Sequence, residues 1–335
     1  EPMNKPYLIT HATIVTMNDE REILYDAAVA IDGSHIAALG TTDELCAQYP
    51  EAEVIDGTGK VVLPGLINAH THISMSLQKG VMLSVPEGLY RVMWPVETSL
   101  TAEDCYVGGL IGGAEALKGG TTTVVDHYFH IEQVAKATTD LGLRGVLGHT
   151  IMSRLGPITG ERELDAGIDF VRRWKDEHPL VTPWLAPHAS DTVARDWLLR
   201  LREVASEENV GLHLHLAQSP RERAYIKEQV GMGCVEYLAD LDFLGPDVLA
   251  AHCIYIDDAE IDLLAETGAH PVYCPMGHAL GGNPARAWEM LQRGADVLIG
   301  TDCVCGNNEM NLVSELRIAG ASQKQLTGDS EAMPA

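Results

Sequence analysis

Two histidines separated by one residue, His70 and His72, end an apolar run over residues 61–72. Side chains alternate along a β-strand, so both imidazoles would point the same way if this run is a strand. Two neutral imidazoles held side by side suit a divalent metal ion better than a dry core. The alternative is a pair of hydrogen-bonded histidines in a loop, and this motif alone leaves both interpretations open.

Polar side chains that can bind a metal also end most of the later apolar runs. They are His127, His188, His213, His215, His252 and Asp302. Fourteen histidines placed at random would rarely collect at so many strand ends, and the reactive groups of parallel barrels lie at these ends. We therefore expect one divalent metal ion, with Zn²⁺ preferred and Fe²⁺ as the alternative. Its expected ligands are His70, His72, His215 and Asp302, with His252 close behind.

The segments that carry these residues follow two patterns. Residues 1–60 read as short strands over 7–16, 27–31, 35–39 and 53–55, which predicts a small, partial β-domain that needs further strands. From residue 61 the pattern becomes strand, loop, helix, repeated, which is typical of a parallel sheet. The expected strands are 61–72, 121–127, 144–150, 181–188, 210–216, 248–254, 271–274 and 296–302.

The predicted fold is therefore α/β, a (β/α)8 TIM barrel over residues 61–335 with a small N-terminal β-domain over residues 1–60. The helices between the strands are expected at 101–117, 131–141, 164–177, 194–208, 222–241, 258–267 and 284–293. After Asp302 only residues 310–325 read as a helix. We expect the C-terminal half of the small domain to be missing, which leaves sheet edges exposed and favours a homo-oligomer.

Composition limits the partners of the chain. The 335 residues are 46% hydrophobic, enough for a large core. A formal charge of −25 argues against nucleic acid and anionic membranes as partners and leaves small-molecule substrates. Seven irregularly spaced cysteines do not form a disulfide framework, and no apolar run is long enough to cross a bilayer, so we expect a cytoplasmic protein.

Five stretches resemble the amidohydrolase superfamily, in the branch of S-adenosylhomocysteine/methylthioadenosine deaminases, guanine and cytosine deaminases, and triazine chlorohydrolases. They are residues 64–72, 120–126, 212–217, 250–253 and 300–302, in the order in which the family has them. The resemblance implies metal ligation by the four expected ligands. It also implies that Asp302 takes a proton from the attacking water and that His252 orients that water or the developing charge. Residues 186–190 hold no lysine that could bridge two metals, so we expect a mononuclear centre.

Gln218 departs from the deaminases of this branch, which have a glutamate at this position to move protons. An amide can hold a ring nitrogen or a carbonyl by hydrogen bonds, but it cannot carry a proton at neutral pH. The resemblance therefore implies a hydrolase in which a water activated by one metal attacks a purine-, pterin- or triazine-like ring, most simply as a deaminase. Hydrolytic dechlorination and amide or carbamate hydrolysis are the alternatives, and a non-catalytic metal-binding relative is a further one.

Contacts with the substrate are expected from residues that follow the strands. His188 matches a histidine that contacts substrate in the family, and His127 lies in a similar loop after the second strand. Trp94 could stack on a heterocycle or pack in the core. Arg162 could bind a substrate carboxylate or be a solvated charge at a helix start. The remaining residues are Asn307, one of two asparagines shared with the family, and His278, which could contact substrate but is expected to be a surface or loop-bracing residue.

Overall fold

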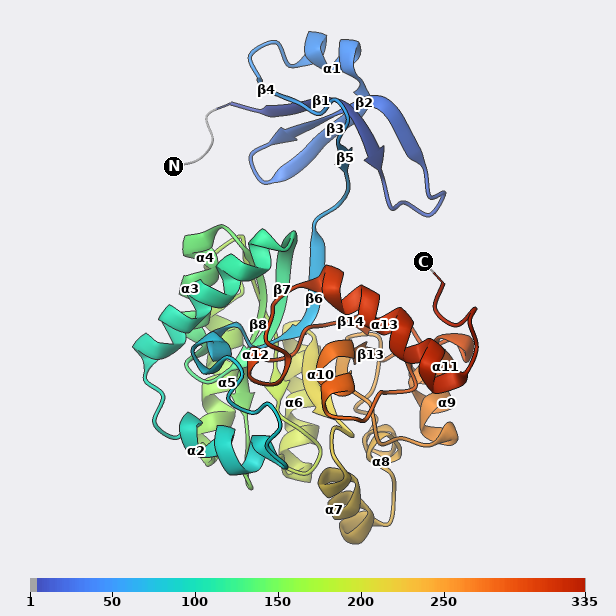
Figure 1. Cartoon of the computed structure of the whole chain (residues 1–335). Helices are drawn as coiled ribbons and strands as arrows, with labels where there is room; N and C mark the ends of the chain where they lie inside the picture. Colours follow the sequence, from blue (N-terminus) through green and yellow to red (C-terminus); the bar gives the residue numbers. More distant parts are fainter. Residues whose placement is uncertain (1–4, 335) are drawn as a thin grey trace. The chain divides into compact units, whose positions relative to one another are not determined.

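The computed structural model describes residues 5–334 of the chain. Its contacts divide the chain into two compact units, Glu1–Gly65 and Leu66–Ala335, drawn in sequence colours in Figure 1. No helix among the described residues is both long enough and apolar enough to cross a membrane.

The first unit is built on a five-stranded sheet. Its strands are β1 (Tyr7–Val15), β2 (Ile23–Asp32), β3 (His35–Thr41), β4 (Glu53–Asp56) and β5 (Val61–Val62). The order is β3-β2-β1-β4, with β5 also paired to β1. Strands β1, β2 and β3 pair antiparallel, whereas β4 and β5 pair with β1 in parallel.

One helix of this unit, α1 (Thr42–Gln48), was not predicted from the sequence. It starts with a capping box in which Thr41 and Glu44 satisfy each other's backbone N–H groups. Leu45 on its inner face packs with Leu8 and two alanines of β2. The helix thus covers one face of the sheet, and its seven residues are too few to show a clear helical repeat in the sequence.

The second unit contains two parallel sheets. Its strands are β6 (Leu66–Thr71), β7 (Thr121–Tyr128), β8 (Arg144–Ile151), β9 (Val181–Pro183), β10 (Ala186–Pro187), β11 (Leu212–Leu216), β12 (Val248–His252), β13 (His270–Tyr273) and β14 (Leu298–Ile299). One sheet has the order β10-β8-β7-β6, with β9 paired to β8, and the other has the order β11-β12-β13-β14.

Isolated bridges join these two sheets at both seams. Leu185 and Ala189 pair with β11 at one seam, and Thr71 pairs with Asp302 at the other. The parallel strands therefore curl into a closed ring, in the order in which the sequence predicts them. At the second seam a Cβ atom added to Gly300 would lie 2.7 Å from the backbone oxygen of His70, so the close approach of first and last strands requires glycine here.

Helices lie outside this ring (Figure 1). The α-helices between or after the strands are α2 (Trp94–Glu97), α3 (Ala102–Lys118), α4 (Ile131–Leu141), α5 (Glu161–Trp174), α6 (Arg195–Glu208), α7 (Pro220–Val230), α8 (Cys234–Asp240), α9 (Asp258–Thr267), α10 (Pro275–Leu280), α11 (Ala287–Gln292), α12 (Val304–Asn307) and α13 (Leu312–Thr327). The single helix predicted over 222–241 is wrong, because Gly231 at φ 78° ends α7 and a new helix starts after Gly233. The short helices α10 and α12 were not predicted.

Candidate active site

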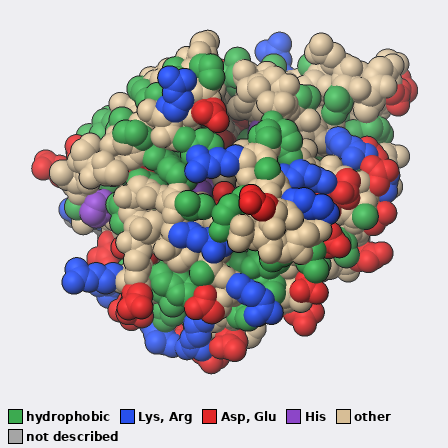
Figure 2. All heavy atoms as spheres, turned by 90° about the horizontal axis from the view of Figure 1, so that it is seen from below, with side chains coloured by type: hydrophobic (Ala, Val, Ile, Leu, Met, Phe, Trp, Pro, Cys, Tyr) green, Lys and Arg blue, Asp and Glu red, His purple; other side chains and the backbone are tan. Residues whose placement is uncertain are grey.

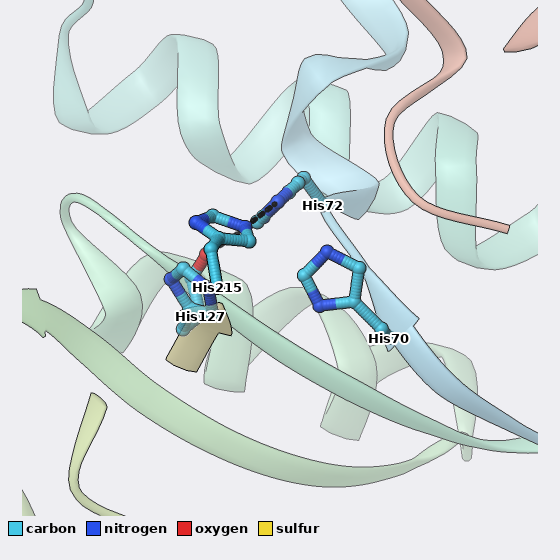
Figure 3. A group of neighbouring side chains, drawn as sticks. All are labelled: His70, His72, His127 and His215. Atoms are coloured by element: carbon cyan, nitrogen blue, oxygen red, sulfur yellow. Dashed lines mark hydrogen bonds between the residues drawn. The ribbon is translucent and has the colours of Figure 1, made fainter. Parts of the chain in front are cut away.

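Four potential metal ligands meet at one end of the ring. His70 and His72 come from the end of β6, His215 from β11, and Asp302 follows β14. The Nε2 atoms of His72 and His215 are 3.3 Å apart, as Figure 3 shows. Oδ1 of Asp302 lies 3.4 Å from Nε2 of His70 and 3.6 Å from Nε2 of His72. Four side chains from three distant parts of the sequence therefore converge on one point.

Backbone contacts across the seam hold Asp302 beside the two histidines of β6. The amide of Asp302 donates to the carbonyl oxygen of His70 at 3.0 Å. The Asn68 side chain donates to the Thr301 hydroxyl at 2.8 Å and accepts from the Thr301 amide at 3.0 Å. These bonds fix the last ligand to the strand that carries the first two.

The ring nitrogens that face away from this point also have partners. Nδ1 of His72 donates to the carbonyl oxygen of His127 at 2.9 Å, which leaves the Nε2 lone pair free to bind a cation. Nδ1 of His70 is 2.8 Å from Nε2 of His213. His213, which the sequence placed at a strand end, thus lies behind His70 as its orienting neighbour.

The electrostatics of the group suit a divalent cation. His70 and His215 are buried, and burial holds the pKa of each well below its ordinary value, so both imidazoles are neutral and can donate a lone pair. Burial also acts to lower the pKa of His72, but the carboxylate of Asp126, 3.7 Å from Nδ1, and the charge of Asp302 outweigh it and raise that pKa. Nε2 of His70 is buried without a hydrogen-bond partner among residues 5–334. A buried nitrogen without a partner is costly, and a cation would satisfy it.

His127 belongs to the same cluster. One donor atom each from His70, His72, His127 and His215 lies within 4.8 Å of the others (Figure 3). Nδ1 of His127 is 2.9 Å from the Thr150 hydroxyl, and its Nε2 has no hydrogen-bond partner within residues 5–334. The predicted substrate contact His127 therefore lies close enough to the ligands to face either the cation or the substrate.

A cavity of about 350 Å³ opens above these side chains. His72, His215 and Asp302 line its floor. Its walls are largely apolar and include Met75, Met82, Leu89, Trp94, Phe129, Met152 and Ile254. A mostly apolar cavity with a few convergent polar groups is typical of a small-molecule site. On the face of the molecule shown in Figure 2, charges of both signs are interspersed with hydrophobic side chains.

The remaining predicted substrate residues fall into two groups. His188, His252, Gln218 and Trp94 line the cavity. Trp94 also packs edge-on against Tyr90, with 4.8 Å between the ring centroids.

Arg162 and Asn307 are not among the residues that line the cavity. Arg162 lies in the first turn of α5 with an exposed side chain. Asn307 is buried, and its Nδ2 donates to the carbonyl oxygen of Thr301 at 2.7 Å and to Oε1 of Glu315 at 2.5 Å. In the structure Arg162 thus lies at the surface, and Asn307 braces the loop that carries Asp302.

Sequence reasoning missed one buried carboxylate in the cavity wall, Glu97. The Tyr128 hydroxyl donates to Oε1 of Glu97 at 3.0 Å. Burial raises the pKa of Glu97 to about 7. An acidic residue at the end of the apolar stretch 89–97 was the available signal, because buried acids are rare unless they have a function.

Gln218 is held over the cavity by a second buried carboxylate. Its backbone amide donates to Oε2 of Glu222 at 2.8 Å, and the Ser190 hydroxyl donates to Oε1 of Glu222 at 2.7 Å. Glu222 itself does not line the cavity. Its carboxylate therefore fixes the backbone of Gln218, and the amide side chain of Gln218 faces the substrate space.

A model of the amidohydrolase family matches residues 61–335. The chain belongs to the amidohydrolase family. The predicted resemblance is confirmed, and the chain is a hydrolase of this family. A shorter match, over residues 27–52, is to an imidazolonepropionase-like composite domain of bacteria.

Individual relatives of this amidohydrolase match nearly the whole chain. The 5'-deoxyadenosine deaminase of Methanosarcina mazei is 35% identical over 332 residues, which are 98% of this chain and 76% of the relative. The 5-methylthioadenosine/S-adenosylhomocysteine deaminase of Thermoanaerobacter pseudethanolicus is 33% identical over the same shares of the two chains. The zinc-bound crystal structure of an adenosine deaminase from Xanthomonas campestris superposes with a TM-score of 0.91 at 28% identity, covering all of this chain and 77% of the other.

Proposed function

We propose that this amidohydrolase is a mononuclear zinc-dependent aminohydrolase that deaminates a purine-like heterocycle of the nucleoside type. The observation that carries the proposal is the convergence of His70, His72, His215 and Asp302 at one end of the ring, where the last three of them line one largely apolar cavity. The deaminase names of its relatives and the zinc in the Xanthomonas structure support it.

The cation site uses residues from opposite sides of the ring. Three imidazole nitrogens and one carboxylate match the nitrogen and oxygen ligands that Zn²⁺ prefers in catalytic sites. Zn²⁺ bound there would lower the pKa of a water molecule and polarise the bond that is attacked. The protein's part is to hold the four side chains rigidly, which the seam contacts and the hydrogen bond from His72 to the His127 carbonyl do.

Asp302 is the proposed general base. Its carboxylate stands beside the ligand nitrogens of β6 and also lines the cavity, so it reaches both the water and the substrate. In deamination the oxygen of water adds to the ring carbon that bears the amino group, and Asp302 accepts the water proton. Asp302 then returns this proton to the amino group, which leaves as ammonia when the carbon–nitrogen bond breaks, and the second proton of the water ends on the adjacent ring nitrogen of the keto product.

His252 and His188 are the proposed groups that hold the substrate over the cation. Burial lowers the pKa of each to about 3, so both rings are neutral and act by hydrogen bonding. Nδ1 of His188 is 2.9 Å from the Thr192 hydroxyl, which fixes that ring. Trp94 and the methionines of the wall give a heterocycle an apolar surface to pack against.

Glu97 is the proposed group that binds the sugar of a nucleoside. Its carboxylate, one oxygen of which is bonded to Tyr128, faces the cavity and can accept hydrogen bonds from sugar hydroxyls. Above pH 7, where Glu97 is ionised, each such hydrogen bond to the charged group contributes about 1.5–3 kcal/mol. A nucleoside therefore gains more from this cavity than the free base does.

Gln218 favours a second candidate function. It lines the cavity where a proton carrier is expected, and its amide cannot carry a proton. A leaving group that departs without a proton, such as chloride, would not need one. Hydrolytic dechlorination, or hydrolysis of an amide-like bond, is therefore the alternative on the same scaffold.

One coupled experiment on the full chain tests these proposals. Metal content is measured first, followed by release of ammonia and chloride from aminated and chlorinated purine nucleosides, purines, pterins and triazines. One zinc per chain with ammonia release from a nucleoside supports the first proposal. One zinc with chloride release alone supports the second, and absence of any turnover refutes both.

A further inference from the structure

His278 is buried against the cavity, although the sequence favoured a loop-bracing role for it. It lies in α10 and is 5% exposed. Its Nε2 is 3.1 Å from Nδ1 of His252, and both residues line the cavity. The ring of Tyr273 supports that of His278, with 5.4 Å between centroids. His278 therefore has a fixed position from which it contacts a proposed catalytic histidine.

The hydrogen bond between these two rings contains a single proton, because a neutral imidazole has one N–H and one lone pair. Nδ1 of His278 is buried with no hydrogen-bond partner among residues 5–334. If that nitrogen carried the proton, the unpaired group would be a buried N–H donor, which is the rarer and costlier case in proteins. The proton of His278 is therefore best placed on Nε2, where it is donated to Nδ1 of His252.

This direction also agrees with the surroundings of His252. When Nδ1 accepts, the proton of a neutral His252 must be on Nε2. A ring nitrogen of His252 lies within 4.8 Å of a carboxylate oxygen of Asp302. Because Nδ1 is directed toward His278, Nε2 is the nitrogen left to face the carboxylate, where an N–H is favourable and a lone pair is not.

We propose that His278 is a positioning residue that fixes His252 as the Nε2–H tautomer and so makes it a hydrogen-bond donor toward the reacting atoms. Its importance rests on the proposed function, in which Gln218 cannot supply a proton at this side of the cavity. A correctly oriented donor on His252 would stabilise negative charge that develops on the ring as water adds.

The same residues could instead bind a second cation, and the experiment must distinguish this possibility from the hydrogen bond between His278 and His252. Donor atoms of His252, Cys274 and His278 lie within 4.8 Å of one another, which would also fit a second cation. In that case Nδ1 of His252 would bind a metal instead of accepting a proton. Metal stoichiometry distinguishes the two, because loss of Cys274 removes an ion only in the second case.

The test compares His278→Gln with His278→Leu in the full-length, zinc-loaded protein. The glutamine amide can reach Nδ1 of His252 and donate to it, whereas leucine fills similar space without a donor. We expect His278→Leu to lower kcat by about 10- to 100-fold, the usual effect of losing a partner of an active-site histidine. His278→Gln should recover most of the rate, with zinc content equal in all three proteins.

The ¹⁵N resonances of the His252 ring give a readout that needs no turnover. In the wild type, Nε2 of His252 should carry the proton and Nδ1 should not. The signals of this ring are identified by their absence in the variant His252→Asn. A proton on Nδ1, an unchanged kcat in His278→Leu, or a second metal equivalent that disappears in Cys274→Ser would each overturn the proposal. If no substrate is turned over, the proposed function fails while the resonances still decide the tautomer.

Discussion

Nε2 of His72 and Nε2 of His215 face each other at 3.3 Å across the ring, although the two residues are 143 positions apart in the chain. Because Nδ1 of His72 donates to a backbone carbonyl, its Nε2 presents a lone pair to His215. Without a cation, Nε2 of His215 can donate a hydrogen bond to this lone pair, whereas a bound cation would give both nitrogens a common partner. This relationship underlies the first prediction.

Removal of the metal should inactivate and destabilise the protein. A ligand present at 100 times its Kd stabilises the folded state by about 2.7 kcal/mol, so Tm should fall on chelation and recover on addition of Zn²⁺. His72→Ala should behave like the chelated protein, whereas the exposed His35→Ala should not. Tm and bound zinc are measured together, and an unchanged Tm in His72→Ala would contradict the assignment.

Asp302→Asn should preserve the fold and reduce turnover by about 10²- to 10⁴-fold, the usual contribution of a general base. The amide is similar in size to the carboxylate but cannot accept the proton of water. The helical variant Asp196→Asn, at an exposed position, is the control. Circular dichroism and kcat are compared, and a near-normal kcat would remove Asp302 from the role of base.

Gln218→Glu should raise the rate of ammonia release from aminated substrates, because it supplies the proton carrier that the cavity lacks. Gln218→Ala, which removes the side chain without adding an acid, is the matched control. Ammonia and chloride are measured in parallel. If the rate of chloride release or of amide-bond hydrolysis is unaffected and the rate of ammonia release does not increase, deamination is not the reaction of this enzyme.

Glu97→Gln should raise KM for nucleosides by about 10- to 100-fold while KM for the free base changes little. The predicted effect corresponds to one hydrogen bond to a charged group. Glu103→Gln, at an exposed position of α3, serves as the control. Equal KM changes for nucleoside and base would mean that Glu97 supports the cavity wall and does not bind the sugar.

Glu222 should make stability depend on pH. Burial, with a smaller contribution from Asp191, raises the pKa of Glu222 from 4.5 to about 7. The unfolded chain releases this proton near pH 4.5 and the folded one only near pH 7. The contribution of the neutral carboxyl to stability is therefore complete below pH 4.5 and is lost as pH rises to 7.

Glu222→Gln, which is neutral at every pH, should flatten this dependence by about 2–3 kcal/mol. Urea unfolding between pH 4.5 and 8 measures it, with Glu266→Gln at an exposed position of α9 as the control. A slope equal to that of the wild type would show that Glu222 is already ionised in the folded protein.

The repeated strand and helix pattern predicted most of the second unit, because the longer helices and strands there have enough residues to show their period. Helices α4 and α9 begin and end where the sequence predicts them. Short elements such as α10 and α12, of six and four residues, could not be predicted, since their formation depends on tertiary contacts. His278 lies in one of them, which is why its contact with His252 was not foreseen.

The position of the histidines and Asp302 at the ends of predicted strands indicated that they would lie close together, because a parallel barrel brings these ends together. The sequence could not tell which substrate residues turn inward. Arg162 and Asn307 follow strands as closely as Trp94 does, yet neither lines the cavity. The direction of a loop side chain is set by neighbours distant in the chain, such as the Thr301 and Glu315 partners of Asn307.

The seam between β6 and Asp302 has a consequence for how the protein matures. Asp302 is synthesised 230 residues after His72, so the two histidines acquire their carboxylate partner only when the ring has closed. Metal capture by the full ligand set would thus report closure of the ring, and an ion that binds across the seam would oppose its reopening. The metal ion would then stabilise the closed barrel in addition to taking part in catalysis.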